Sequence, residues 1–261
     1  MKAQDIYDHM RKIGTWVNWQ ATTDHFQIGD PQTEVKAVAV AWQARLDAIK
    51  KAAGMGCNMF ITHEQFEYPE PQVARKDEKQ PYEVEKRRFC EEHGIVVMRC
   101  HDVWDRVPEV GIVDSWAAQL GLKGGSAGNA TEAVHPAPAG TLRGLAKHVL
   151  TKTKPLGQDG VEMLGEPEAK ITRVAIGCGA GTNYRKMVKM GADAIIGTDD
   201  GMSYWSEGSW ALDRGLPVVI VAHCISEEPG MKNLAAYIGK QFGVKAIHIP
   251  QGSMYRLVGK S

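Results

Sequence analysis

The sequence has no excess of charge of either sign. Its 261 residues carry 31 Lys and Arg against 31 Asp and Glu, so the formal net charge is zero. A surface that follows nucleic-acid phosphates usually leaves a basic excess, and the balance therefore argues against a nucleic-acid binder. No apolar run approaches the roughly 20 residues of a membrane-spanning helix, which argues against a membrane protein.

Paired cysteines and an export signal are also missing. The five cysteines are scattered along the chain and form no Cys-x-x-Cys pair. The polar amino-terminal residues lack the apolar stretch of a secretory signal. An odd number of separated thiols in such a chain predicts buried cysteines in a reducing compartment, and we expect a cytoplasmic protein.

A complete P-loop is absent as well. The chain has no Gly-x-x-x-x-Gly-Lys-[Ser/Thr] segment. One Gly-rich segment, Ile176–Thr182, lies between a predicted strand and a predicted helix. Two interpretations of it stay open: a tight turn where the backbone approaches a neighbouring element, or a turn that binds an anion at the start of the helix.

Short apolar runs alternate with amphipathic segments along most of the chain. The runs predict strands at Val35–Ala41, Asn58–Thr62, Ile95–Cys100, Ile171–Ile176, Ala192–Ile196, Val218–Ala222 and Val244–Ile249. The amphipathic segments predict helices at Ala44–Met55, Glu83–His93, Asp114–Leu120, Asn183–Met190 and Met231–Phe242. This alternation predicts an α/β fold made of two lobes with mixed, largely parallel sheets.

Two stretches interrupt the alternation. Gly121–Gly140 is rich in Gly, Ala and Pro, which predicts a long loop or a domain junction without helix or strand. Thr151–Lys170 holds further Gly and Pro and predicts an irregular surface segment. We therefore expect a first lobe at residues 1–122, a connecting region at 123–170 and a second lobe at 171–261, or else one interlocked unit.

Side chains that can bind metals follow four of the apolar runs. They are His63, Glu64, His101, Asp102, Asp105, Asp199, Asp200, His223 and Glu227. Each has an ordinary alternative, because loop histidines often bond to the backbone and acidic residues often cap helices. Strand ends of α/β sheets nevertheless border ligand crevices, and imidazole with carboxylate is a ligand set for divalent metals.

Several short motifs recur in the order and spacing of a known family. They are Asp24–Pro31, Phe60–Glu64, His101–Asp105, Asp114–Leu122, Gly177–Thr182, Gly191–Ile196 and Ala222–Gly230. By them the chain resembles the NIF-three-like family, also described as dinuclear-metal hexameric proteins or GTP cyclohydrolase I type 2 homologues. The resemblance implies a homohexamer and two divalent ions, Zn, Mn, Fe or Mg, in a cleft between two α/β lobes.

The resemblance also implies which residues hold the metal. The implied ligands are His63, Glu64, Asp105, His223 and Glu227. Glu64 stands where the family usually has a second His, and this harder carboxylate favours Mn, Fe or Mg. The Tyr-His turn of the family's second lobe is absent, because residues 198–205 contain no His.

Two functions follow as hypotheses. In the first, the protein is a metal-dependent hydrolase of a nucleotide-like or phosphorylated small molecule, similar to a type 2 GTP cyclohydrolase, with Asp102 or Asp199 as general acid or base. In the second, it is a non-catalytic, metal-stabilised hexameric scaffold or regulator that binds other proteins.

Overall fold

A computed structural model describes residues 1–67, 81–124, 127–128 and 130–258. The contacts within it divide the chain into two compact units. The first unit comprises Met1–Trp104 and Met231–Pro250, and the second comprises Asp105–Gly230 and Gln251–Ser261. This division differs from the predicted lobes, because residues 105–122 and 123–170 belong to the second unit and residues 231–250 to the first.

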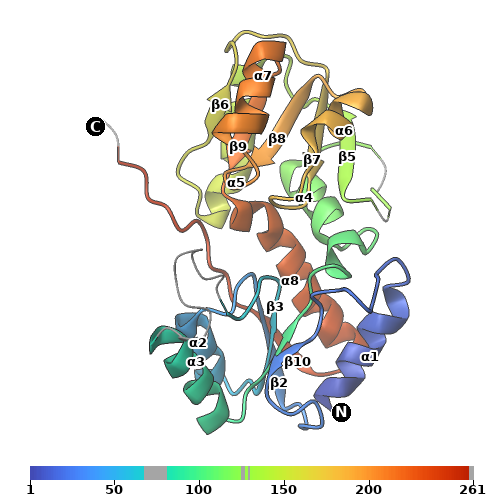
Figure 1. The fold of residues 1–261 in the computed structure, drawn as a ribbon, viewed down its shortest axis with the longest axis vertical. Coiled ribbons are helices and arrows are strands. Elements are labelled where there is room, and N and C mark those ends of the chain that lie inside the picture. The colour runs from blue at the N-terminus through green and yellow to red at the C-terminus, as the bar shows by residue number, and fades with distance from the viewer. Residues whose placement is uncertain (68–80, 125–126, 129, 259–261) are drawn as a thin grey trace. The chain divides into compact units, whose positions relative to one another are not determined.

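The first unit is built on a five-stranded sheet in the order β1-β4-β3-β2-β10. Figure 1 labels β2, β3 and β10 of this sheet. Its strands are β1 (Phe26–Ile28), β2 (Ala37–Ala41), β3 (Met59–Thr62), β4 (Val96–Arg99) and β10 (Lys245–His248). β1 is antiparallel to β4, and the other pairs are parallel. The helices are α1 (Ala3–Ile13), α2 (Leu46–Gly54), α3 (Pro81–Glu92) and the second half of α8 (His223–Phe242).

Packing in the first unit explains the continuous apolar run of β2. Ala37, Ala39 and Ala41 are buried in a cluster that includes residues of α2 and α3. Val38 and Val40, which project from the other face, are also fully buried. A parallel strand covered on both faces has no polar side to alternate with.

The second unit is built on a sheet in the order β5-β7-β8-β9-β6. Its strands are β5 (Glu132–Pro136), β6 (Glu162–Leu164), β7 (Arg173–Gly177), β8 (Ala194–Thr198) and β9 (Val218–Val221). The central three strands are parallel, and the edge strands β5 and β6 are antiparallel to their neighbours. The helical segments are η1 (Trp104–Arg106), α4 (Ile112–Leu120), α5 (Leu142–Thr153), η2 (Lys154–Leu156), α6 (Tyr184–Lys189), the π-helix η3 (Tyr204–Gly208), α7 (Ser209–Arg214) and the start of α8.

These sheets confirm the predicted α/β fold with mixed, largely parallel sheets. Every predicted strand is present, and its ends differ from the prediction by about two residues at most, which is the usual uncertainty of element ends. Among the described residues, no helix is both long enough and apolar enough to cross a membrane.

The prediction that Gly121–Gly140 contains no strand is wrong. Glu132–Pro136 forms β5, which pairs with β7 in antiparallel register, His135 opposite Val174. Pro136 is compatible with this strand because β5 lies at the sheet edge, where one side of the backbone has no strand to bond. The irregular segment predicted at Thr151–Lys170 likewise contains an edge strand, β6. The Gly- and Pro-rich composition of both segments resembles that of loops. They are strands because they pair with β7 and β9, which lie elsewhere in the chain.

The predicted start of the last helix is also wrong. The sequence predicts a helix from Met231, after Pro229-Gly230, but α8 begins at His223 and has Pro229 inside it. A proline in a helix removes one backbone hydrogen bond. Burial of Cys224, Ile225 and Glu228 holds this first part of the helix in place.

Gly230 marks a close packing contact inside the second unit. A Cβ atom at this position would lie 2.5 Å from Cδ1 and 3.0 Å from Cα of Ile112 in α4. We predict that Gly230→Ala lowers the free energy of unfolding by about 1–3 kcal/mol, the usual cost of overpacking. Gly239→Ala in the same helix is the matched control, because its Cβ would make only ordinary contacts. Urea unfolding in which both variants retain wild-type stability would contradict the packing described.

Candidate metal centre

In the first unit, two neighbouring strands deliver histidines to one sheet edge. β3 and β4 are parallel and pair Thr62 with Arg99, so His63 and His101 follow at the same end. His63 is completely buried, and its Nδ1 lies 3.1 Å from the carbonyl oxygen of Cys100. Because a carbonyl only accepts, the proton is assigned to Nδ1 and Nε2 carries the lone pair that a metal requires.

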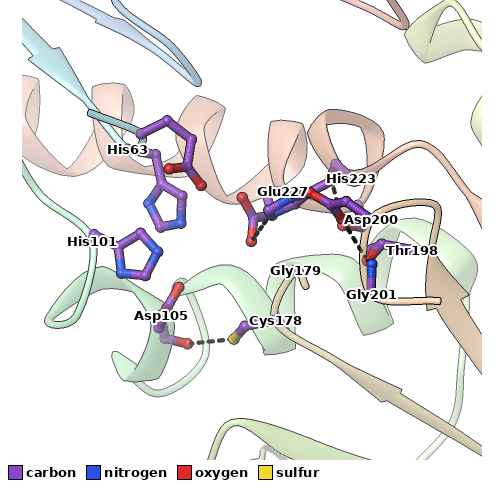
Figure 2. A network of polar contacts seen from close by, with 12 residues as sticks. His63, His101, Asp105, Cys178, Gly179, Thr198, Asp200, Gly201, His223 and Glu227 are labelled. Carbon is purple, nitrogen blue, oxygen red and sulfur yellow. Dashed lines mark hydrogen bonds and ion pairs between the residues drawn. The ribbon is translucent and has the colours of Figure 1, made fainter. Parts of the chain in front are cut away.

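His101 is held in a similar way by a carboxylate. Its ring stacks on that of His63 (Figure 2), with centroids 4.4 Å apart. Its Nδ1 lies 2.9 Å from Oδ1 of Asp102. Thr22 donates to Oδ2 of the same carboxylate at 2.8 Å. The hydrogen bond from His101 lowers the pKa of Asp102 far below its usual value, against the opposing effect of burial. Asp102 is therefore an anion at neutral pH that orients the His101 ring.

The loop that carries His101 depends on Asp24. The buried carboxylate of Asp24 accepts hydrogen bonds from the backbone N–H groups of His101, Asp102 and Val103 at 2.7, 2.9 and 2.9 Å. Burial raises the pKa of Asp24, and these three bonds oppose the shift. The sequence contains Asp24 in one of its recurring motifs but gives no sign of this role, since the partners lie about 80 residues away.

Glu64 completes the first set of candidate ligands. His63, Glu64 and His101 each offer one ligand atom, and the three atoms lie within 4.8 Å of one another. Arg99 donates from Nε to the carbonyl oxygen of His63 at 2.8 Å and from Nη2 to Oε2 of Glu64 at 3.2 Å. We call these three ligands the first half-site.

In the second unit, the first turn of α8 supplies two ligands. His223 and Glu227 are four residues apart, and Nε2 lies 3.0 Å from Oε1. Nδ1 of His223 lies 2.7 Å from Oδ2 of Asp200, whose Oδ1 accepts a bond from the Thr198 hydroxyl at 3.1 Å (Figure 2). Burial lowers the pKa of His223, but the Glu227 and Asp200 carboxylates outweigh it and raise the value to about 11. In the absence of a metal, His223 is therefore protonated at neutral pH, and its charged ring lies between the two carboxylates.

Asp199 binds the first residue of the helix that carries these side chains. Its Oδ1 accepts bonds from the backbone N–H groups of His223 and Asp200, both at 3.0 Å. The bond to His223 joins residues 24 positions apart, so it is a tertiary contact and not a local helix cap.

The Gly-rich turn packs directly against the same two ligands. Gly179 has a φ of +45°, and a Cβ there would lie 2.2 Å from Nε2 of His223 and 2.7 Å from Oε1 of Glu227. These contacts support the interpretation as a tight turn that approaches a neighbouring element. The adjacent Cys178 thiol donates to the carbonyl oxygen of Asp105 at 3.7 Å. Burial, followed by the charge of Asp105, raises the pKa of this thiol well above its usual value.

Asp105 completes the second set of ligands. One of its carboxylate oxygens lies within 4.8 Å of a carboxylate oxygen of Glu227. Asp105, His223 and Glu227 form what we call the second half-site. The five residues that the family resemblance implies as ligands are distributed over the two half-sites, and their role as ligands stays a prediction.

Two residues outside the implied ligand set contribute, and the sequence had placed both among the side chains that can bind metals. His101 belongs to the first half-site although it is outside the implied ligand set, and Asp200 orients His223. A signal existed for both residues, since each follows a predicted strand, as the ligands do. The partner that fixes each role is defined only by the fold.

The protein therefore belongs to a class of two-unit α/β proteins. In this class each unit has a mixed sheet, and candidate metal-binding His and carboxylate side chains lie at the strand ends. The chain belongs to the Duf34/NIF3 (NGG1p interacting factor 3) family, whose pattern it matches over residues 1–253. It is 24% identical over 241 residues to the GTP cyclohydrolase 1 type 2 homolog of Clostridium perfringens, a match that covers 88% of each chain.

Solved structures share the fold. A Staphylococcus aureus hypothetical protein superimposes with a TM-score of 0.81 at 18% identity, covering 99% of both chains. A Bacillus cereus protein related to NIF3 gives 0.78 at 15% identity, covering 100% of this chain and 99% of the other. Reduced HcgD from Methanocaldococcus jannaschii gives 0.72 at 21% identity over 95% of this chain and 97% of its own.

The contact at Gly179 leads to a test of the second half-site. We predict that Gly179→Ala lowers the affinity for Mn²⁺ or Zn²⁺ about tenfold or more, because the new methyl group displaces the His223 imidazole. Gly181→Ala is the matched control, since a Cβ there meets nothing within 4 Å. Calorimetric titration of both variants measures the difference. Equal affinities would show that Nε2 of His223 does not take part in binding.

Proposed function

We propose that this protein binds two divalent metal ions through the two half-sites and is a metal-dependent hydrolase. The observation that carries the proposal is the state of the three histidines. Nδ1 of His63, His101 and His223 each faces an oxygen acceptor, which leaves Nε2 of each ring as the nitrogen that can bind a metal.

The donor set fits divalent cations. The half-sites combine three imidazoles with the carboxylates of Glu64, Asp105 and Glu227, and no thiol belongs to either group. Such nitrogen and oxygen ligands suit Zn, Mn and Fe, and the three carboxylates shift the preference toward the harder ions. When bound, a divalent ion supplies Lewis acidity and lowers the pKa of water toward neutrality.

The surrounding residues hold the ligands in place. Asp102 and Asp200 orient His101 and His223, and Arg99 neutralises part of the charge of Glu64. We keep Asp199 as the general acid or base. The backbone N–H groups of His223 and Asp200 both bind Oδ1, so neither of these two bonds uses Oδ2, and the residue lines a cavity that a small molecule can enter. Asp102 takes a positioning role instead, since its low pKa and two hydrogen bonds oppose proton exchange.

The substrate class is proposed from the relatives. The Clostridium perfringens protein is named as a GTP cyclohydrolase 1 type 2 homolog, which supports a nucleotide-like or phosphorylated small molecule. Hydrolysis of such a molecule requires an activated water and a group that moves its proton, and the half-sites with Asp199 offer both.

A second candidate function is a scaffold that binds other proteins. Tyr204 and Trp205 on η3 are 86% and 93% exposed, and large exposed aromatic side chains are enriched at protein interfaces. In this alternative the metal ions stabilise the protein and take no part in turnover.

The role of Asp200 gives a test of metal binding alone. We predict that Asp200→Asn weakens Mn²⁺ or Zn²⁺ binding about tenfold to 100-fold, because an amide supports the imidazole less well than a carboxylate. Asp213→Asn is the control, since Asp213 is exposed on α7. An unchanged metal affinity in Asp200→Asn would remove Asp200 from the site.

Activity separates the two candidate functions. The purified protein is screened against nucleotides and phosphoesters with Mn²⁺ or Zn²⁺, and its metal content is measured by elemental analysis. We expect about two metal equivalents per chain and turnover that His223→Ala abolishes, while His93→Ala, an exposed histidine of the α3 end, retains it. Metal retention without any turnover would favour the scaffold, and failure to retain metal would contradict both.

A further inference from the structure

The second unit contains a cavity beside the edge strand β6 that none of the candidate metal ligands lines, although Asp199 does. Its volume is about 450 Å³, within the range of small-molecule sites. Its lining comes from the segment before β6, the end of β9 and the carboxy-terminal residues of the described chain. We call it the β6 cavity.

All charged residues that line the β6 cavity are acidic. Asp159, Glu162 and Asp199 line it, and no Lys, Arg or His is among the lining residues. A phosphate or carboxylate ligand would meet three carboxylates and no positive partner. Electrostatics therefore exclude an anionic occupant and favour a cation.

The three carboxylates do not form a metal site. They are not among the groups whose ligand atoms lie within 4.8 Å of one another in the described part of the chain. One oxygen of Asp199 is also occupied by the backbone N–H groups of His223 and Asp200. A single metal ion needs ligand atoms close together. Carboxylates that lie apart suit a larger organic cation, such as an amine or amidine, better than a metal ion.

Most of the remaining lining residues are apolar or aromatic. Val161, Val221, Leu257 and Tyr255 line the cavity, together with the polar Gln158 and Ser253. Leu257 packs so closely on Gly160 that a Cβ at position 160 would lie 2.2 Å from Cδ1 of Leu257. Such walls bury hydrocarbon, and a tyrosine ring attracts a cation over its face.

We propose that the β6 cavity binds a small organic cation, an amine or amidine carried on an apolar or aromatic body. A second cavity of the same volume shares Glu162, Asp199 and Ile220 with it and is also free of Lys, Arg and His. The strand register agrees with the lining of the β6 cavity. Glu162 lies opposite Ile220 in the β6–β9 pair, so both side chains project from the same face of the sheet. The proposal does not rest on the metal sites.

Three ligands of nearly equal shape test the proposal. Benzamidine is cationic, benzamide neutral and benzoate anionic, so a titration of the metal-free full-length protein with each isolates the effect of charge. We expect saturable binding of benzamidine, at least about fivefold weaker binding of benzamide, and no binding of benzoate. Equal binding of benzamide, tighter binding of benzoate, or no saturable binding of benzamidine would overturn the proposal.

Variants locate the ligand. Glu162→Gln and Asp159→Asn keep the side-chain shape and are each expected to weaken benzamidine binding about fivefold. Glu166→Gln is the matched control, because Glu166 is an exposed acid that lines neither cavity. An equal loss in Glu166→Gln, or no loss in the first two, would place the cation elsewhere. Since no metal is added, these outcomes are independent of the hydrolase test.

Discussion

Fixed imidazole rings are the constraint on which the candidate metal centre depends. A neutral histidine binds a metal through the nitrogen that does not carry the proton, and the hydrogen bond of the other nitrogen decides which one that is. Here a backbone carbonyl, Asp102 and Asp200 set that choice for His63, His101 and His223. The two aspartates repeat one device, a carboxylate on Nδ1, in units of different sequence.

Each half-site arises from the end of a largely parallel sheet. In the first unit β3 and β4 bring His63 and His101 to one edge, and Asp24 ties down the loop between sheet and ligand. In the second unit β8 leads to Asp199 and Asp200, which together start α8 and orient its first histidine. Buried polar groups are costly unless paired, so these supporting bonds also keep the charged ligands compatible with a packed interior.

Local pattern predicted much of this fold and missed what depends on distant partners. The buried strands were readable because Ala37–Ala41 and Val218–Val221 are continuous apolar runs. β5 could not be predicted from the sequence, because its Gly- and Pro-rich surroundings resemble a loop. Only its pairing with β7 makes it a strand. The start of α8 was misplaced for a related reason, since Pro229 predicts a helix boundary unless packing around Ile225 and Gly230 overrides it.

The sequence by itself determined the α/β class, the family resemblance and the types of residue available as ligands. Periodicity and strand-end position are local properties, and they indicated which His and carboxylate side chains can bind metals; the family resemblance then implied His63, Glu64, Asp105, His223 and Glu227 as the ligands. Only the tertiary structure decided which group supports each ligand: Asp24 and Asp102 for His101, Asp200 for His223, and Gly179 against the His223–Glu227 pair. Such contacts join residues far apart in the chain, and a distance between atoms cannot be read from residue order.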